Sequence, residues 1–147
     1  MTAQKIHLVR IQEHLQELKD AVALGLEYRP ATLGFHSTAC AIDLLETYLH
    51  KVGKIPIGMQ VKHDWFKRPK PGQKIIPLVE RKLQVEFSHK AEIIDLLYDL
   101  EEQRNTLIYG NATPGKINST WHVFQKLKQL LLGMLREAGE EIEDPVQ

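Results

Sequence analysis

Apolar side chains recur along this chain at spacings of three and four residues, which is the repeat of an α-helix with one buried face. The first such run, Gln4–Tyr28, is predicted to be one long helix that ends before Pro30, because proline disfavours the helical conformation in the residue before it. A second run follows over Ala31–Lys51, with Gly53 placed to end it. The buried face of the first helix is expected to carry Leu8, Ile11, Leu15, Leu18 and Val22.

The second half of the chain predicts three further helical segments. Pro77–Leu83 suits a short helix with proline in its first turn, and Ser88 is placed as the N-cap of a helix over His89–Tyr109 that ends at Gly110. Asn118–Thr120 supplies capping residues for a last helix with Val123, Leu127, Leu130 and Met134 at helical spacing. Because no segment alternates as a strand does, the sequence predicts an all-α fold, an antiparallel up-and-down bundle of four to five helices.

The connection over Lys54–Gln73 breaks the helical pattern. It contains three prolines and two glycines, and it holds five of the seven Lys and Arg residues of the basic stretch Lys51–Lys74. Cationic side chains beside aromatic ones favour a loop that binds phosphates and stacks bases. The alternative is a solvated loop that its two aromatic residues, Trp65 and Phe66, attach to the bundle. The candidate residues for phosphate or nucleic-acid binding are Lys62, Trp65, Lys67, Arg68 and Lys70.

The length of 147 residues fits one domain, predicted here over residues 1–139, followed by an acidic tail over residues 140–147. A charged fraction of 26% and a hydrophobic fraction of 43% are those of an ordinary globular protein, and no stretch resembles a membrane span or a signal peptide. We therefore expect a cytoplasmic protein. The single cysteine, Cys40, lies in an apolar helical pattern and is expected to pack rather than react.

The helix over His89–Tyr109 places an arginine inside its apolar face. A guanidinium that is always charged requires a carboxylate, a carbonyl, a ligand or a solvent-filled cleft, unless it reaches the edge of its helix. Asn105 and Tyr109 give a neighbouring face with polar tips. The arginine is Arg104, which projects near the middle of a stripe formed by Ile93, Leu97, Leu100, Leu107 and Ile108.

Other motifs carry less weight. Gly110–Lys116 matches part of the phosphate-loop pattern, but it follows a helix, and Ile117 stands where a magnesium-binding hydroxyl is required. Glu86–His89 has the spacing of a di-iron ligand pair without a second pair. His7 and His14 lie two turns apart, too far for one metal ion, and are expected at the surface. The sequence thus predicts no metal site and no cofactor.

The order of these elements resembles the HEPN family, named for higher eukaryotes and prokaryotes nucleotide-binding. The resemblance extends over Gln4–Ala138, and its sharpest parts are Gly34–Ala41 (GFHSTACA) and Arg104–Tyr109 (RNTLIY). It implies an antiparallel helix bundle that is often dimeric. Many members are metal-independent ribonucleases that pool an arginine, a polar residue and a histidine from two chains. Others bind nucleotides or proteins, commonly beside a minimal nucleotidyltransferase.

By this resemblance Arg104 matches the family's arginine and Asn105 its polar position. Tyr109 stands in place of the histidine, and Asn111 stands where one branch adds a tyrosine. A neutral imidazole can accept the proton of a ribose hydroxyl near pH 7, whereas an ordinary tyrosine, with a pKa of about 10, is a poor base there. The motif therefore supports a polar cleft better than standard nuclease chemistry.

The first interpretation is a homodimeric bundle that binds a nucleotide, RNA or a partner protein through a cleft lined by Arg104, Asn105 and Tyr109, without standard nuclease activity. An alternative is a metal-independent endoribonuclease of a toxin–antitoxin pair with a minimal nucleotidyltransferase, in which His36 or His89 acts as the base. A second alternative is a purely structural interaction bundle, in which Arg104 forms a structural ion pair.

Overall fold

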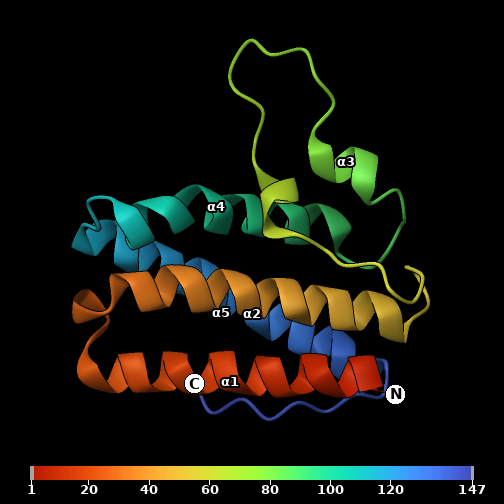
Figure 1. Ribbon diagram of the computed structural model, residues 1–147, viewed down its shortest axis with the longest axis horizontal. Helices are drawn as coiled ribbons and strands as arrows, with labels where there is room; N and C mark the ends of the chain where they lie inside the picture. Colours follow the sequence, from red (N-terminus) through yellow and green to blue (C-terminus); the bar gives the residue numbers. More distant parts are fainter. Residues whose placement is uncertain (1, 147) are drawn as a thin grey trace.

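The computed structural model describes the backbone of residues 2–146 and the side chains of residues 5–146 (Figure 1). The described chain is helical and contains no β-strand, which confirms the predicted all-α helical bundle. No helix in this range is long and apolar enough to cross a membrane. The elements are α1 (Thr2–Leu24), η1 (Leu26–Tyr28), α2 (Pro30–Lys51), η2 (His63–Phe66), α3 (Leu78–Lys82), α4 (Lys90–Tyr109) and α5 (Pro114–Glu137), where η marks a 3₁₀-helix.

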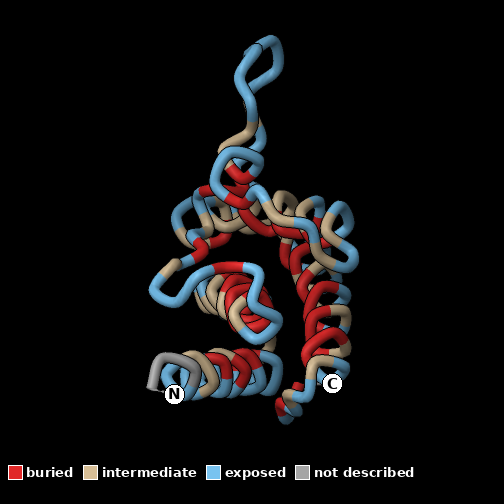
Figure 2. The backbone as a smooth tube through the Cα atoms, turned by 90° about the vertical axis from the view of Figure 1, so that its right-hand side faces the viewer, coloured by how far each residue is buried: buried red, intermediate tan, exposed pale blue. Residues whose placement is uncertain are grey.

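Helix α2 lies at the centre of the bundle. It packs against α1, α4 and α5, and Figure 2 shows it between α1 and α4 with α5 alongside. A helix takes this position when apolar residues cover most of its circumference. Cys40 is buried here as predicted, and burial raises the pKa of its thiol, so it packs as a protonated apolar group. The fully buried residues of α2 include Leu33, Cys40, Ala41, Leu44, Leu45 and Leu49.

Among the helix boundaries that differ from the sequence prediction are the end of α1 and the starts of α4 and α5. Helix α1 ends at Leu24 rather than Tyr28, since Gly25 adopts a left-handed turn with φ of 100°. His89, not Ser88, precedes α4 as its N-cap. Helix α5 begins at Pro114, ahead of the predicted caps, because Thr113 accepts a hydrogen bond from the Lys116 amide at 3.2 Å and Pro114 is preorganised for the first helical position.

A close crossing of α2 and α4 occurs at Gly34. A Cβ atom at this position would lie 2.9 Å from Leu107 Cβ and 3.2 Å from the Arg104 carbonyl oxygen. The absence of a side chain therefore lets the two helices approach. Thr38, one turn along α2, is brought to the same cavity as Arg104.

The connection between α2 and α3 has two parts. Its first part is packed on the bundle, where Ile55, Val61 and Phe66 are buried and Trp65 is only 7% exposed. Residues 67–77 then project away as an exposed loop (Figures 1 and 2). Trp65 and Phe66 thus attach the connection to the bundle, which is the structural role that the sequence left open.

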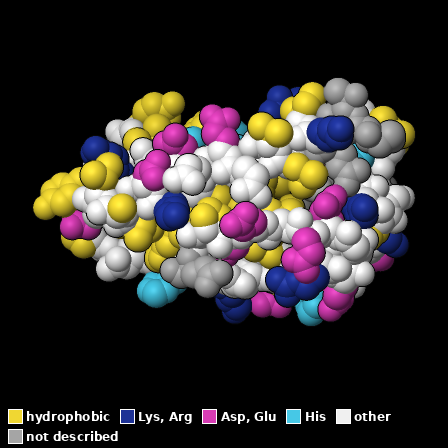
Figure 3. All heavy atoms as spheres, turned by 90° about the horizontal axis from the view of Figure 1, so that it is seen from below, with side chains coloured by type: hydrophobic (Ala, Val, Ile, Leu, Met, Phe, Trp, Pro, Cys, Tyr) yellow, Lys and Arg dark blue, Asp and Glu magenta, His cyan; other side chains and the backbone are white. Residues whose placement is uncertain are grey.

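The acidic tail folds back onto the bundle as far as residue 146. Ile142 and Val146 are buried, and Gln12 of α1 donates a hydrogen bond to the Glu143 carbonyl at 3.4 Å. On the other side, the ammonium of the fully buried Lys128 of α5 binds the Asp144 carboxylate. The tail therefore contacts both α1 and α5. Figure 3 shows acidic, basic and apolar side chains interspersed on this side of the molecule.

Candidate functional site

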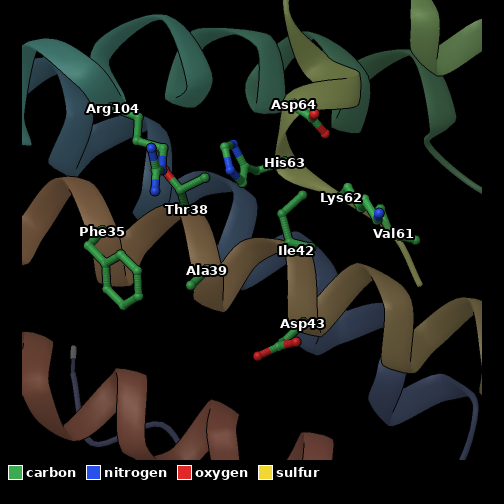
Figure 4. A pocket seen from close by; sticks show the side chains of 10 residues that line it. All are labelled: Phe35, Thr38, Ala39, Ile42, Asp43, Val61, Lys62, His63, Asp64 and Arg104. Atoms are coloured by element: carbon green, nitrogen blue, oxygen red, sulfur yellow. The ribbon is translucent and has the colours of Figure 1, made fainter.

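Arg104 lines a cavity of about 370 Å³ between α2, α4 and the segment 61–64 (Figure 4). Helix α2 forms one wall and the 61–64 segment another. Arg104 projects into the cavity from α4. The polar and charged lining residues are Thr38, Asp43, Lys62, His63, Asp64 and Arg104.

A histidine held by a buried carboxylate stands in this cavity. His63 Nδ1 lies 3.0 and 2.9 Å from the two carboxylate oxygens of Glu101, which is 5% exposed and lies one turn before Arg104 on α4. Because a carboxylate only accepts hydrogen bonds, Nδ1 of the neutral ring carries the hydrogen and Nε2 is the proton acceptor. This is the arrangement that orients a histidine as a general base.

Arg104 has no carboxylate partner among the described side chains. Its only hydrogen bond there runs from Nη1 to the Asn105 side-chain oxygen at 3.3 Å. Thr38, which is 3% exposed, also has a buried Oγ1 without a hydrogen-bond partner in this part of the chain. Buried polar groups without partners cost free energy unless a ligand or water satisfies them. The described residues therefore give no support to a structural ion pair at Arg104, and the two groups together favour a polar, anionic ligand.

The acidic residues of the cavity do not neutralise its cations directly. Asp43 faces α1, where its carboxylate oxygens lie 3.4 Å from His7 Nδ1 and 3.5 Å from His14 Nε2. Asp64 is exposed to solvent. Because no ion pair joins either aspartate to Arg104 within the described residues, the guanidinium remains available to an incoming phosphate.

Neither histidine proposed as a base from the sequence lines this cavity. His36 faces α1, with its Nδ1 2.9 Å from Nδ1 of His14, and His89 lines a separate hollow beside α5. His7 and His14, which were expected at the surface, are 16% and 13% exposed because they face α2, so that expectation was wrong. The described residues contain no group of three His, Cys, Asp or Glu arranged to hold a metal ion.

The two other residues of the sequence motif do not line the cavity. Asn105 is exposed and accepts a hydrogen bond from Arg104 Nη1, while Tyr109 is 82% exposed. One helical residue turns about 100°, so Asn105 projects about 100° and Tyr109 about 140° away from Arg104 around α4. The structure thus brings His63 and Glu101 to Arg104.

The basic connection contributes one of its five predicted binding residues to the cavity, Lys62. Arg68 is engaged on α4, where it binds the carboxylates of Asp99, at 3.0 Å, and Glu102 and lies 5.0 Å over the ring of Tyr98. The hydrogen bond to Glu102 raises the pKa of Arg68. Trp65 has little surface on which a base could stack. The last two of the five predicted residues, Lys67 and Lys70, are exposed to solvent.

Comparison of the chain with models of protein families, with curated proteins and with solved structures gives no significant match. The resemblance carried by Arg104–Tyr109 therefore remains an expectation from the sequence. The assignment of function rests on the geometry of His63, Glu101 and Arg104.

Proposed function

We propose that this cavity binds a phosphodiester of single-stranded RNA and that the protein cleaves it without a metal ion. The observation that carries the proposal is the juxtaposition of an oriented histidine with an unpaired guanidinium in one cavity. The first group can remove a proton and the second can stabilise a phosphoryl anion. This function corresponds to the endoribonuclease alternative, with His63 in place of the histidines named from the sequence.

The reaction follows from the free nitrogen of His63. Nε2 accepts the proton of a ribose 2′-hydroxyl, and the resulting oxygen attacks the neighbouring phosphorus. The bond from phosphorus to the 5′-oxygen breaks, and that oxygen takes a proton from water. The products are a 2′,3′-cyclic phosphate and a 5′-hydroxyl, and the imidazolium returns its proton to solvent. DNA, which lacks the 2′-hydroxyl, is not a substrate of this chemistry.

The remaining groups stabilise charge that develops during the reaction. Arg104 donates N–H groups to the non-bridging phosphate oxygens, where negative charge accumulates in the transition state. The Thr38 hydroxyl supplies a second donor at the cavity floor. Glu101 stabilises the imidazolium that His63 becomes, since its carboxylate faces Nδ1.

The proposal includes a homodimer, because one of the residues that line the cavity is an exposed apolar side chain. This residue is Phe35, which is 46% exposed. Light scattering after size exclusion should give about twice the chain mass of 16.9 kDa. A monomer at high micromolar concentration would exclude a cleft shared by two chains.

Cleavage of a fluorescent single-stranded RNA in EDTA tests the proposed activity. His63→Gln and Arg104→Ala should each lower the rate by about a hundredfold or more. The matched controls are His122→Gln and Arg10→Ala, which change the same residue types at exposed positions outside the cavity. Binding of RNA without cleavage would contradict the catalytic part of the proposal and would favour a binding function for the cavity.

A further inference from the structure

A second cavity, of about 480 Å³, lies next to the first on the same side of α2. Its volume is in the range of small-molecule sites, which lie between about 300 and 1,000 Å³. Helix α2 and the segment that follows it, residue 53 and residues 55–60, form most of its lining, and His7 of α1 also lines it. The lining includes Glu46, His50, Ile55, Ile57, Met59 and Gln60.

The two cavities are neighbours along two elements. On α2, residues 35–43 line the first and residues 46–50 the second, so the midpoints of these two segments lie about 13–14 Å apart along the helix at 1.5 Å per residue. Along the connection, residue 53 and residues 55–60 line the second cavity, and residues 61–64 line the first. Glu46 of the second cavity and Val61 of the first meet at the junction between the two cavities, where Glu46 Oε1 accepts a hydrogen bond from the Val61 amide at 2.6 Å.

The lining of the second cavity differs in charge from that of the first. No Lys or Arg is among the described residues that line it. The buried Glu46 is among them, with its Oε2 2.5 Å from Nε2 of His7, which lines the same cavity. A buried carboxylate disfavours a phosphate there. Ile55, Pro56 and Met59 provide apolar walls. The cavity therefore suits an uncharged group with apolar faces.

Two polar groups could recognise the edge of such a group. His50 Nε2 lies 2.9 Å from the Met59 carbonyl oxygen, which only accepts, so Nδ1 of the neutral ring is the acceptor. Gln60, exposed on the lining, carries both a donor and an acceptor. Donors and acceptors on the rim of an apolar cavity fix the orientation of a bound group.

We propose that the second cavity is the subsite for the base of a nucleotide next to the phosphodiester held by Arg104. The inference rests on the proposed function and extends it, because it makes the substrate a single strand of at least two nucleotides. A nucleobase is the uncharged part of RNA with apolar faces and polar edges. The backbone then crosses from the first cavity, which contains Arg104, to the apolar one, past the Glu46–Val61 junction.

Binding of uncleavable 2′-O-methyl dinucleotides tests the inference. Three probes are compared by fluorescence anisotropy, one with both bases and two with a single base removed from either position. In the parent protein, loss of one particular base should weaken binding about tenfold. The double variant Ile57→Ser with Gln60→Ala should reduce that ratio to about twofold. Both side chains are exposed, Ile57 by 86%, so the variant should fold.

The matched control is Ile75→Ser with Gln84→Ala, which changes the same residue types at exposed positions outside the cavity and should leave the tenfold ratio intact. An unchanged ratio in the Ile57 and Gln60 variant, or equal affinities of the parent for all three probes, would overturn the inference. If either result is found while the parent protein cleaves RNA in a way that depends on His63 and Arg104, the base subsite alone is overturned. If the Ile57 and Gln60 variant loses the tenfold ratio but the parent protein does not cleave RNA, the subsite is supported and the catalytic proposal is overturned.

Discussion

Nδ1 of His63 lies 2.9 Å from Oε2 of Glu101, although 38 positions separate the two residues in the chain. The carboxylate is buried on the rigid helix α4, whereas the ring belongs to a short 3₁₀-turn in the connection. The contact therefore fixes the ring relative to Arg104, one turn further along α4. It also ties the packed part of the connection to the bundle.

Glu101→Gln tests this positioning role. The amide keeps the shape of the side chain but cannot stabilise an imidazolium and can favour the wrong tautomer, so the cleavage rate should fall by about a hundredfold. The Michaelis constant for RNA should change little, because Glu101 does not line the cavity. Glu92→Gln, an exposed substitution on the same helix, is the control. Equal rates for the two variants would remove Glu101 from the mechanism.

Gly34→Ala should destabilise the protein, because the new Cβ atom would meet Leu107 Cβ at 2.9 Å and the Arg104 carbonyl oxygen at 3.2 Å. Overpacking of this kind costs about 1–3 kcal/mol of unfolding free energy. Gly133→Ala on α5 is the matched control, since a Cβ atom there has nothing within 4 Å. Gly133→Ala should instead raise the free energy of unfolding by up to about 1 kcal/mol, because alanine favours the helix more than glycine does. Urea unfolding measures the free energy of unfolding of both variants. If Gly34→Ala loses no more of it than Gly133→Ala does, the close crossing of α2 and α4 is contradicted.

Asp144→Asn tests the attachment of the tail. Lys128 is fully buried and its ammonium binds Asp144 and the Val146 carbonyl, so a neutral partner leaves a buried charge poorly compensated. Breaking a buried pair from one side costs about 3–5 kcal/mol. Glu141→Gln, in the exposed pair with Arg136, should cost less than about 1 kcal/mol. Similar melting temperatures for the two variants would show that the tail does not stabilise the bundle.

The facing rings of His36 and His14 should make the protein sensitive to acid. Their Nδ1 atoms are 2.9 Å apart, so one must donate and the other accept, and protonation of both would oppose two donors. Burial, and then the charge of His14, lower the pKa of His36, while Glu13 and Glu17 of α1 act in the opposite direction. The folded state therefore binds the proton less readily than the unfolded state. Stability should be complete above the ordinary histidine pKa of about 6.5 and fall as the pH drops below it.

Melting curves between pH 7.5 and 5.0 measure this loss. His36→Gln removes the titrating group and should make the melting temperature decline less on acidification. His122→Gln, at an exposed position on α5, should leave the decline as in the parent protein. A steeper decline in His36→Gln than in the parent would contradict the assigned sign.

The helices could be predicted from the sequence because their apolar spacing is local information. Arg104 was found for the same reason, as a charge inside an apolar stripe. The start of α5 was misplaced because Asn118–Thr120 and Thr113 are both capping sequences, and only the structure shows which of them caps the helix. His63 was missed because its partner Glu101 lies far away in the chain, and nothing periodic in the connection indicates which way its ring points.

The chemical form of the RNA ends tests the central claim most directly. RNA cut by the parent protein in EDTA should carry a 2′,3′-cyclic phosphate on one fragment and a 5′-hydroxyl on the other, as measured by mass spectrometry. A 2′-deoxy nucleotide at the cleaved position should block the cut, and His63→Gln should reduce both products together. Fragments with a 3′-hydroxyl and a 5′-phosphate, or cleavage that persists in His63→Gln, would contradict the account.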